Sequence, residues 1–432
     1  MTYSSAIRFL YGLRLFGAKF GLDNTHRLAA LAGAPQDKLS FIHVAGTNGK
    51  GSTCAMLDAI YAAARVRVGL FTSPHLVSFR ERIQIARQWI SENDVVRLVE
   101  QFQPLLAQFP KDHHPTFFEV VTVMALKFFV EQDCSLVIWE TGLGGRLDAT
   151  NIVTPIASVI TNIALDHQEW LGDTLEKIAF EKAGIIKPGI PVLTCADAPG
   201  ALAIIKRIAI ERNAPLTIVT AQAKPPVPAL RGEHQKRNAA LAAATAGALR
   251  GQIPVSDEQI RAGLQNVHWP GRLQTIQSPQ GKDFLLDGAH NVAGIEALRQ
   301  TVTADFGSQK RALILGILKD KDWKNICQII APLADRIFTV PVSSERTADP
   351  NVLAEACRRA NPFAEVFVCD TLAAASSESD SRCLPRSDYL VLIAGSLYLV
   401  GEALELLGYF PSFKSERRLN EWSGEPSFSL RL

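Results

Sequence analysis

The chain has 432 residues, of which 47% are apolar, and its formal net charge at pH 7 is +2. This length exceeds what one hydrophobic core usually holds, so we expect two domains. The near balance of charge, without a long lysine or arginine run, argues against nucleic-acid and membrane-surface binders and favours small molecules as partners.

The N-terminal residues, 1–5, lack a basic region followed by an apolar stretch, and no apolar run approaches the roughly 20 residues of a membrane span. We therefore expect a cytoplasmic protein that does not associate with membranes. The cysteines are scattered without a Cys-x-x-Cys pair, which argues against a disulfide framework and against a zinc site. We interpret them as buried small side chains: Cys54, Cys134, Cys195, Cys327, Cys357, Cys369 and Cys383.

Short β-type runs alternate with helical patterns such as 117–130, a rhythm typical of a parallel sheet covered by helices. A second alternation begins after Pro270-Gly271, where we place the domain boundary, giving domains of 1–269 and 270–432. The Ser/Ala-rich stretch 373–381 is interpreted as a mobile loop. The predicted strands are 41–45, 66–71, 136–139 and 157–163 in the first domain, and 284–286, 312–317, 336–340, 365–368 and 389–393 in the second.

A glycine-rich segment, Gly46–Thr53, follows the first apolar run and predicts a strand, a tight turn and the start of a helix. Backbone N–H groups of such a turn, the helix N-terminus and Lys50 would hold the phosphates of ATP, and Ser52 or Thr53 would offer a hydroxyl to Mg²⁺. The spacing departs from the usual P-loop, so a simple turn is the alternative. The candidate ATP-binding residues here are Gly46, Thr47, Asn48, Gly49, Lys50, Gly51 and Ser52.

Polar residues also follow three other predicted strands, at 72–75, 140–148 and 162–167. Ligands of open parallel sheets bind beyond the carboxyl ends of the strands, so these segments should meet the glycine-rich turn at one edge. Ser73, Glu140 and His167 could complete the ligand shell of Mg²⁺, although histidine is an unusual ligand for that ion. Each alone could equally be a turn residue, a cap or a loop histidine, but their convergence favours a metal-nucleotide site.

Lys182 falls on the apolar face of a helix that Asp173 or Thr174 would cap and Gly184 would end. A lysine near a helix end often reaches solvent along its aliphatic stem, which is the structural interpretation. The functional interpretation is a desolvated amine near the metal centre, with a lowered pKa that permits covalent modification.

Polar segments of the second half include 232–238, Arg272 after the Pro-Gly junction, and 285–291. If ATP lies between the domains, Arg272 could contact phosphates, and Asp287 the ribose or a metal-bound water. As single residues, both could instead be solvated charges or caps.

The chain closely resembles the folylpolyglutamate synthase and dihydrofolate synthase family, a branch of the Mur ligases, over most of residues 35–408. Gly51, between Lys50 and Ser52, is similar to the folate branch rather than to the cell-wall ligases. The motifs that carry the resemblance are 43–52, Thr72–His75, Gly142–Asn151, Leu165–His167, Glu181–Gly184 and Asp287–Asn291.

The resemblance implies an α/β fold, with a parallel-sheet, P-loop-type ATP-binding domain followed by a smaller Rossmann-like domain. It implies ATP phosphates on 49–52, Mg²⁺ (two ions) on Ser73, Glu140 and His167, and a carbamylated Lys182 that bridges to metal. His290 would lie near the transferred phosphate, and Lys50, Lys182 and His290 are the implied catalytic residues. The implied ATP contacts are Asn238, Arg272 and Asp287, and the implied pterin contacts are Thr116, Phe118, Leu147, Asp148 and Ala149.

The activity implied is ATP-dependent ligation of L-glutamate to dihydropteroate and to reduced folates through an acyl phosphate, by a protein we expect to be monomeric. The chain departs from the family pattern at Ala164, at 86–88 and in the tail after Gly408. Two rival interpretations stay open: a ligase that adds an amino acid to a cell-wall precursor, and a nucleotide-binding switch or scaffold that would have no need of Lys182.

Overall fold

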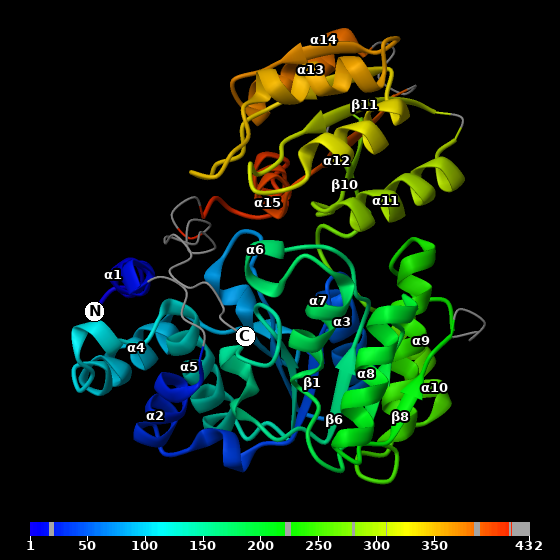
Figure 1. Cartoon of the computed structure of the whole chain (residues 1–432). Helices are drawn as coiled ribbons and strands as arrows, with labels where there is room; N and C mark the ends of the chain where they lie inside the picture. The colour runs from blue at the N-terminus through cyan, green and yellow to red at the C-terminus, as the bar shows by residue number, and fades with distance from the viewer. Residues whose placement is uncertain are drawn as a thin grey trace.

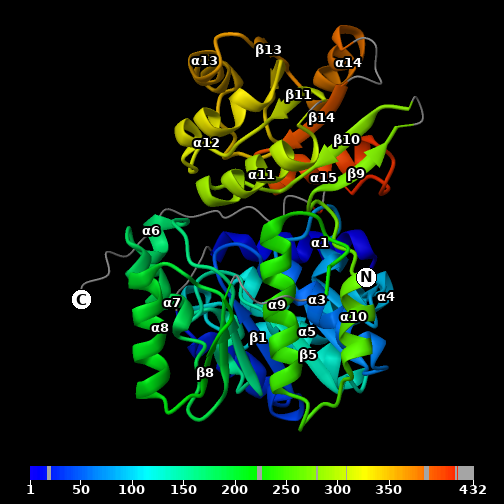
Figure 2. The same ribbon diagram turned by 90° about the vertical axis from the view of Figure 1, so that its right-hand side faces the viewer.

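The structure is a computed structural model, and it describes residues 1–16, 21–220, 226–278, 281–307, 309–383, 389–413 and 416. Two β-sheets, each covered by helices on both faces, form a lower and an upper half in Figure 1, and the quarter turn of Figure 2 keeps them apart. The chain completes the first sheet before it enters the second. This arrangement is the α/β class predicted from the alternating pattern.

The first sheet is mainly parallel, and β1 lies in its middle between β5 and β6. The antiparallel pairs among the described strands, β2 with β3 and β3 with β4, lie at one edge. The strand order is β4-β3-β2-β5-β1-β6-β7-β8. The bounds are β1 Phe41–Ala45, β2 Val68–Phe71, β3 Ile83–Ile85, β4 Gln88–Trp89, β5 Leu136–Glu140, β6 Ala157–Ile160, β7 Val192–Thr194 and β8 Leu216–Ile218.

Helices cover both faces of this sheet, because apolar side chains of β1 point to opposite faces. Ile42 and Val44 face one core with α3, α9 and α10, whereas Phe41 faces the other core with α1, α4 and α5. The helices are α1 Tyr3–Gly12, α2 Asp23–Leu31, α3 Lys50–Ala63, α4 Glu92–Leu106, α5 Phe117–Glu131, α6 Gln168–Leu171, α7 Leu175–Ala183, α8 Pro199–Glu211, α9 Glu233–Ala248 and α10 Asp257–Gln265. The 3-10 turns are Leu13–Phe16, Pro35–Lys38, Phe79–Arg82, Lys111–His113 and Ala149–Ile152.

The strand register brings the predicted polar segments together. Val44 of β1 is paired with Glu140 of β5, and Ala45 is paired with Ile160 of β6. The glycine-rich turn, Glu140 and the segment after β6 therefore leave the sheet side by side. Phe71 at the end of β2 is paired with Trp139, which brings Ser73 to the same edge.

The second sheet is parallel except for β9, which pairs antiparallel with β10 at one edge. Its strand order is β13-β12-β11-β14-β10-β9. The strands are β9 Gln274–Gln277, β10 Asp283–Leu286, β11 Lys310–Leu315, β12 Arg336–Thr339, β13 Glu365–Val368 and β14 Tyr389–Ala394. The helices are α11 Val292–Asp305, α12 Trp323–Ile330, α13 Pro350–Ala360, α14 Leu372–Arg382 and α15 Leu397–Leu406, with a 3-10 turn at Ala331–Leu333. We propose residue 270, in the connection from α10 to β9, as the domain boundary.

The predicted strands are all present: 41–45 and 365–368 match in full, and the ends of the others are shifted by one to three residues. The prediction of a mobile loop at 373–381 is wrong, because this stretch lies within α14. Thr371 caps α14 by accepting from the N–H of Ala374, and its buried stripe is formed by small side chains such as Ala375 and Ser379. Because small residues, one of them serine, occupy the buried face of α14, the sequence lacks the helical spacing of large apolar residues.

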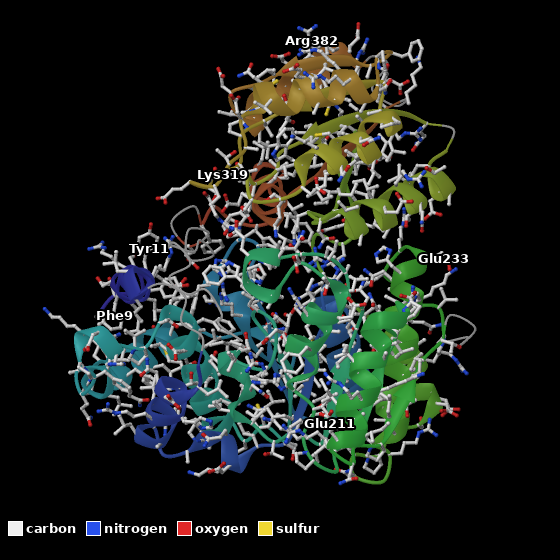
Figure 3. All side chains as sticks on the ribbon, viewed as in Figure 1. Phe9, Tyr11, Glu211, Glu233, Lys319 and Arg382 are labelled. Carbon is white, nitrogen blue, oxygen red and sulfur yellow. The ribbon has the colours of Figure 1, made fainter. Side chains whose placement is uncertain are left out.

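Exposed charged residues such as Glu211, Glu233 and Arg382 lie on the outside of the molecule (Figure 3). All seven cysteines are buried and unbridged, which confirms their interpretation as buried small side chains. Within the described ranges no helix combines the length and the apolarity needed to cross a bilayer.

The tail after Gly408 lies in part outside the described residues. Glu416 is described and is buried against the first half of the chain. Its carboxylate accepts hydrogen bonds from the hydroxyls of Tyr3 and Ser78 and from the N–H of Phe79, at 3.0, 2.8 and 2.8 Å. The tail thus returns from α15 to the loop that carries Ser73.

Candidate active site

The glycine-rich turn between β1 and α3 is tightly curled. Gly49 has a φ of +84°, and a Cβ placed there would lie 2.6 Å from Oδ1 of Asn238, so the position requires glycine. The Lys50 ammonium donates back to the carbonyl oxygens of Gly46 and Thr47, at 3.0 and 3.3 Å. No side chain of the described residues caps α3, so its N-terminal N–H groups are suited to an anion.

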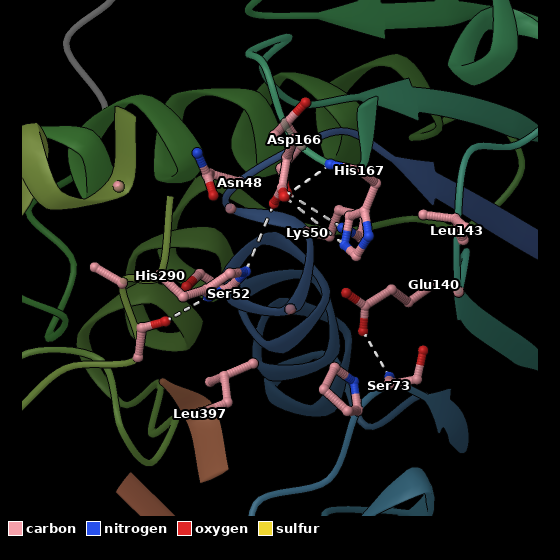
Figure 4. A pocket seen from close by; sticks show the side chains of 18 of the residues that line it. Asn48, Lys50, Ser52, Ser73, Glu140, Leu143, Asp166, His167, His290 and Leu397 are labelled. Carbon is pink, nitrogen blue, oxygen red and sulfur yellow. Dashed lines mark hydrogen bonds and ion pairs between the residues drawn. The ribbon is translucent and has the colours of Figure 1, made fainter. Parts of the chain in front are cut away.

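One cavity of about 400 Å³ lies beyond the strand ends, and residues of both halves line it (Figure 4). It brings together every residue predicted for the site except Gly46 and Thr53; of the two hydroxyls offered to Mg²⁺, that of Ser52 lines the cavity, whereas Thr53 is fully buried. A Cβ on Gly46 would lie 1.8 Å from Oγ1 of Thr161, so this glycine faces the first sheet instead and supplies its carbonyl to Lys50. The roles of the other residues remain predictions.

Glu140 and Ser73 meet in the cavity wall, where the N–H of Ser73 donates to Oε2 of Glu140 at 3.0 Å (Figure 4). Burial raises the pKa of Glu140 to about 7, although Lys50 and Arg272 oppose the rise. A bound cation would hold this carboxylate in its ionised form. Burial lowers the pKa of His167, whose imidazole is therefore neutral and offers a nitrogen lone pair.

These residues suit a magnesium ion better than a transition metal. Within the described part of the chain, no group of three or more His, Cys, Asp and Glu side chains is arranged to hold a metal. A hydroxyl, one carboxylate and one imidazole leave room for water and phosphate oxygens, as Mg²⁺ usually requires. The donors present therefore fit an ion that arrives with a nucleotide.

Lys182 is only 4% exposed and lines the same cavity from α7. Burial, and then the charge of Lys50, lowers the pKa of Lys182 to about 7. Thr174 caps α7, and the helix ends at Ala183, as predicted. Arg146 holds the end of α7 in place, because its N–H donates to the carbonyl of Glu181 at 2.7 Å and its guanidinium pairs with the Glu181 carboxylate at 2.8 Å.

The residues predicted to contact a pterin also line the cavity. Two of them also have structural tasks. Thr116 caps α5 by accepting from the N–H of Glu119, and Asp148 accepts from the N–H groups of Leu143 and Thr150, at 2.7 and 3.0 Å. Phe118 lies against Gly142, where a Cβ would lie 2.5 Å from its ring. The aromatic ring and the nearby polar backbone suit a flat heterocycle.

The second half contributes Arg272, Asp287 and His290 to the cavity. Asp287 accepts from the N–H groups of Leu273 and Ala289, both at 2.9 Å, so it shapes the loop as well as lining the cavity. Nδ1 of His290 lies 2.7 Å from the carbonyl oxygen of Gly288. Because a carbonyl only accepts, Nδ1 carries the proton, which leaves Nε2 directed toward Asp166.

Several cationic residues of the cavity were missed by the sequence analysis. Lys321 and Arg346 come from the loops after β11 and β12, and Arg82 comes from the loop after β2. The rule that ligands gather at the carboxyl ends of parallel strands, applied to the second sheet as well, could have found Lys321 and Arg346.

The comparisons with known proteins identify Mur ligase relatives over most of the chain. The model for the Mur ligase middle domain matches residues 44–213, and the model for the Mur ligase glutamate ligase domain matches residues 271–397. A dihydrofolate synthase/folylpolyglutamate synthase of Bacillus subtilis is 35% identical over 429 residues, covering 93% of this chain and 98% of the relative.

Solved structures show the same likeness in three dimensions. The folylpolyglutamate synthase of Thermotoga maritima superposes with a TM-score of 0.82 at 33% identity, covering 96% of this chain and 98% of that one. FolC of E. coli in complex with DHPP and ADP gives 0.83 at 29% identity, covering 95% and 98%. The predicted two-part α/β architecture is therefore confirmed.

Proposed function

Because the chain belongs to the folylpolyglutamate synthase and dihydrofolate synthase family of Mur ligases, we propose that it joins L-glutamate to dihydropteroate and to reduced folates at the expense of ATP. The observation that carries this proposal is one cavity in which a phosphate-type turn, a buried carboxylate, a buried lysine and an aromatic end lie together. Nucleotide at one end and acceptor at the other would place the reacting groups in its middle.

The reaction needs activation because a carboxylate is a poor electrophile. A carboxylate oxygen of the acceptor attacks the γ-phosphorus of ATP, the bond to the bridging oxygen breaks, and ADP leaves. The amino group of glutamate, having lost one proton, then attacks the acyl carbon, and phosphate departs as the amide forms. Positioning and charge stabilisation supply most of the catalysis of such a transfer.

The chain's own cations would do much of this work. Lys50 lies at the start of α3, where its ammonium can leave the carbonyls of Gly46 and Thr47 for the β- and γ-phosphates. Arg272 reaches the same space from the second half, and His290, whose Nε2 faces Asp166, would lie near the transferred group. Asn238 would border the nucleotide from α9.

Magnesium, when bound, would neutralise phosphate charge and orient the γ-phosphate. Ser73, Glu140 and His167 are the residues that we propose to hold it. We also propose that Lys182 is carbamylated: its amine nitrogen, partly neutral near pH 7, bonds to the carbon of CO₂ and loses a proton. This change replaces a buried cation with an oxygen ligand that suits the cavity.

The rivals are less well supported. A cell-wall ligase would share the family models, but the Bacillus subtilis relative, which covers 93% of this chain, is named for folate chemistry. A nucleotide-binding switch would have no use for a buried lysine that lines the cavity.

The proposal is tested by measuring ADP release by the purified protein with Mg-ATP, L-glutamate and either dihydropteroate or tetrahydrofolate. We expect release to require both glutamate and one of the two acceptors. ADP release that is independent of acceptor would favour the switch, and absence of release from a folded protein that binds ATP would refute the proposed acceptors.

A further inference from the structure

Asp166 connects the two halves of the molecule. It follows β6 of the first sheet, and its side chain is only 8% exposed. Oδ1 accepts from the Lys321 ammonium at 2.7 Å, and Oδ2 accepts from the Asn291 amide at 2.9 Å. Nε2 of His290 lies 3.6 Å from Oδ2. These three partners all belong to the second half, so one carboxylate gathers side chains from across the cavity.

The same cluster reaches the phosphate-binding turn. The side-chain amides of Asn48 and Asn291 bond to each other in both directions, at 3.1 and 2.9 Å. Asn291 also caps α11, because its Oδ1 accepts from the N–H of Gly294 at 2.8 Å. The turn, the cap of α11 and Asp166 are therefore parts of one hydrogen-bonded cluster, and Figure 4 shows Asp166 beside Asn48 with His290 nearby.

The Lys321–Asp166 pair favours the arrangement seen here. Lys321 is 7% exposed and Asp166 is 8% exposed, so both charges are removed from bulk water while they are paired. A buried charge that loses its partner is strongly disfavoured, because the remaining charge lacks both water and a counter-ion. Partial separation of the halves would break the ion pair before water could hydrate the two charges, so such separation is unfavourable.

We propose that Asp166 is a positioning residue that holds the second half against the phosphate-binding turn while the activated intermediate exists. This inference rests on the proposed function, because it concerns the coupling of ATP cleavage to ligation. An acyl phosphate reacts with water as well as with an amine, so its yield of amide depends on exclusion of water from the cavity. We call the contacts of Asp166 with Lys321, Asn291 and His290 the latch. Loss of the latch lets water compete for the acyl carbon.

The test compares Asp166→Asn, Lys321→Met and the double variant for both ADP released and amide formed. In the natural chain we expect close to one amide per ADP. Each single variant should release several ADP per amide and lower the rate of ligation at least tenfold, and the double variant should be no worse than either single one, because both remove the same pair. Asp173→Asn is the matched control: its pair with Lys177, at 2.9 Å, is exposed and joins the residue before the N-cap of α7 to that helix.

A second measurement does not depend on activity. Small-angle X-ray scattering of the ligand-free variants should give a larger radius of gyration for Asp166→Asn and Lys321→Met than for the natural chain, with Asp173→Asn unchanged. Excess nucleotide and acceptor should reduce that difference, since ligands bound by both halves favour the closed form.

The outcomes separate the possible failures. One outcome is that Asp166→Asn uncouples the reaction but Lys321→Met does not. Asp166 would then act through His167, whose backbone N–H donates a hydrogen bond to Oδ1 of Asp166, and the latch would be refuted. If Lys321→Met only raises the KM for glutamate, with one amide per ADP, Lys321 binds substrate and the latch is refuted. If the natural chain forms no amide with either acceptor, the proposed function fails, whereas the scattering result still decides whether the pair holds the halves together.

Discussion

Replacement of Asp58 by asparagine should stabilise the protein, and the gain in the free energy of unfolding should increase with pH. Asp58 lies on α3, is 3% exposed, and its Oδ1 has no hydrogen-bond partner among the described residues. Burial raises the pKa of Asp58 from 3.8 to about 7, and the guanidinium of Arg87, 4.0 Å away, offsets only part of the rise. The folded state therefore keeps a proton that the unfolded chain has released.

The sign and size of the effect follow from this difference. Because the folded state binds more protons than the unfolded state between about pH 4 and pH 7, the free energy of unfolding falls as pH rises through that window. At about 1.4 kcal/mol per pH unit, the full cost of ionised Asp58 is about 4 kcal/mol above pH 7. The asparagine of the variant would carry no such cost, since its amide does not titrate.

The assay is thermal unfolding of the natural chain and Asp58→Asn at pH 5 and at pH 8. The advantage of the variant should grow by about 3 kcal/mol between these values, which corresponds to roughly 3 °C in Tm if the whole chain unfolds together and roughly 5 °C if the first half unfolds alone. Asp173→Asn, an exposed control, should show no such growth. An advantage that is the same at both pH values would refute the assignment of a buried, protonated Asp58.

Three further predictions concern the cavity. Lys182→Ala should lower glutamate-dependent ADP release at least 100-fold while circular dichroism shows a folded chain; turnover near the natural rate would contradict the catalytic assignment. Gly142→Ala places a Cβ 2.5 Å from the Phe118 ring, so the KM for the pterin acceptor should rise roughly tenfold with the KM for ATP unchanged, as steady-state kinetics would reveal. Removal of divalent cations with EDTA should abolish ADP release and added Mg²⁺ should restore it; activity that survives dialysis against EDTA would count against the donor set at Ser73 and Glu140.

Much of the first sheet could be predicted because its signals are local. The run Phe41–Ala45 is fully buried and sits between two parallel strands, so its apolar character and the turn after it are both visible in the sequence. The buried position of Lys182 followed from helical spacing alone, since the neighbouring residues of its stripe are apolar. Parallel strands then bring separate motifs to one edge without further information.

The missed features depend on contacts between distant residues. Lys321 and Arg346 belong to the cavity because the second sheet faces the first, which no local pattern records. The structural tasks of Thr116 and Asp148, as caps beside the predicted pterin end, likewise emerge only once α5 and the loop after β5 are folded. Helix α14 was missed because its buried stripe carries serine and alanine rather than large apolar residues.

The central claim is tested most directly by mass spectrometry of the products formed from Mg-ATP, L-glutamate and each acceptor in turn. The account predicts dihydropteroate and tetrahydrofolate products that have each gained a glutamyl residue, with ADP formed in step. Glutamylation of only one acceptor would restrict the enzyme to that single activity. Consumption of ATP with neither acceptor glutamylated would contradict the account.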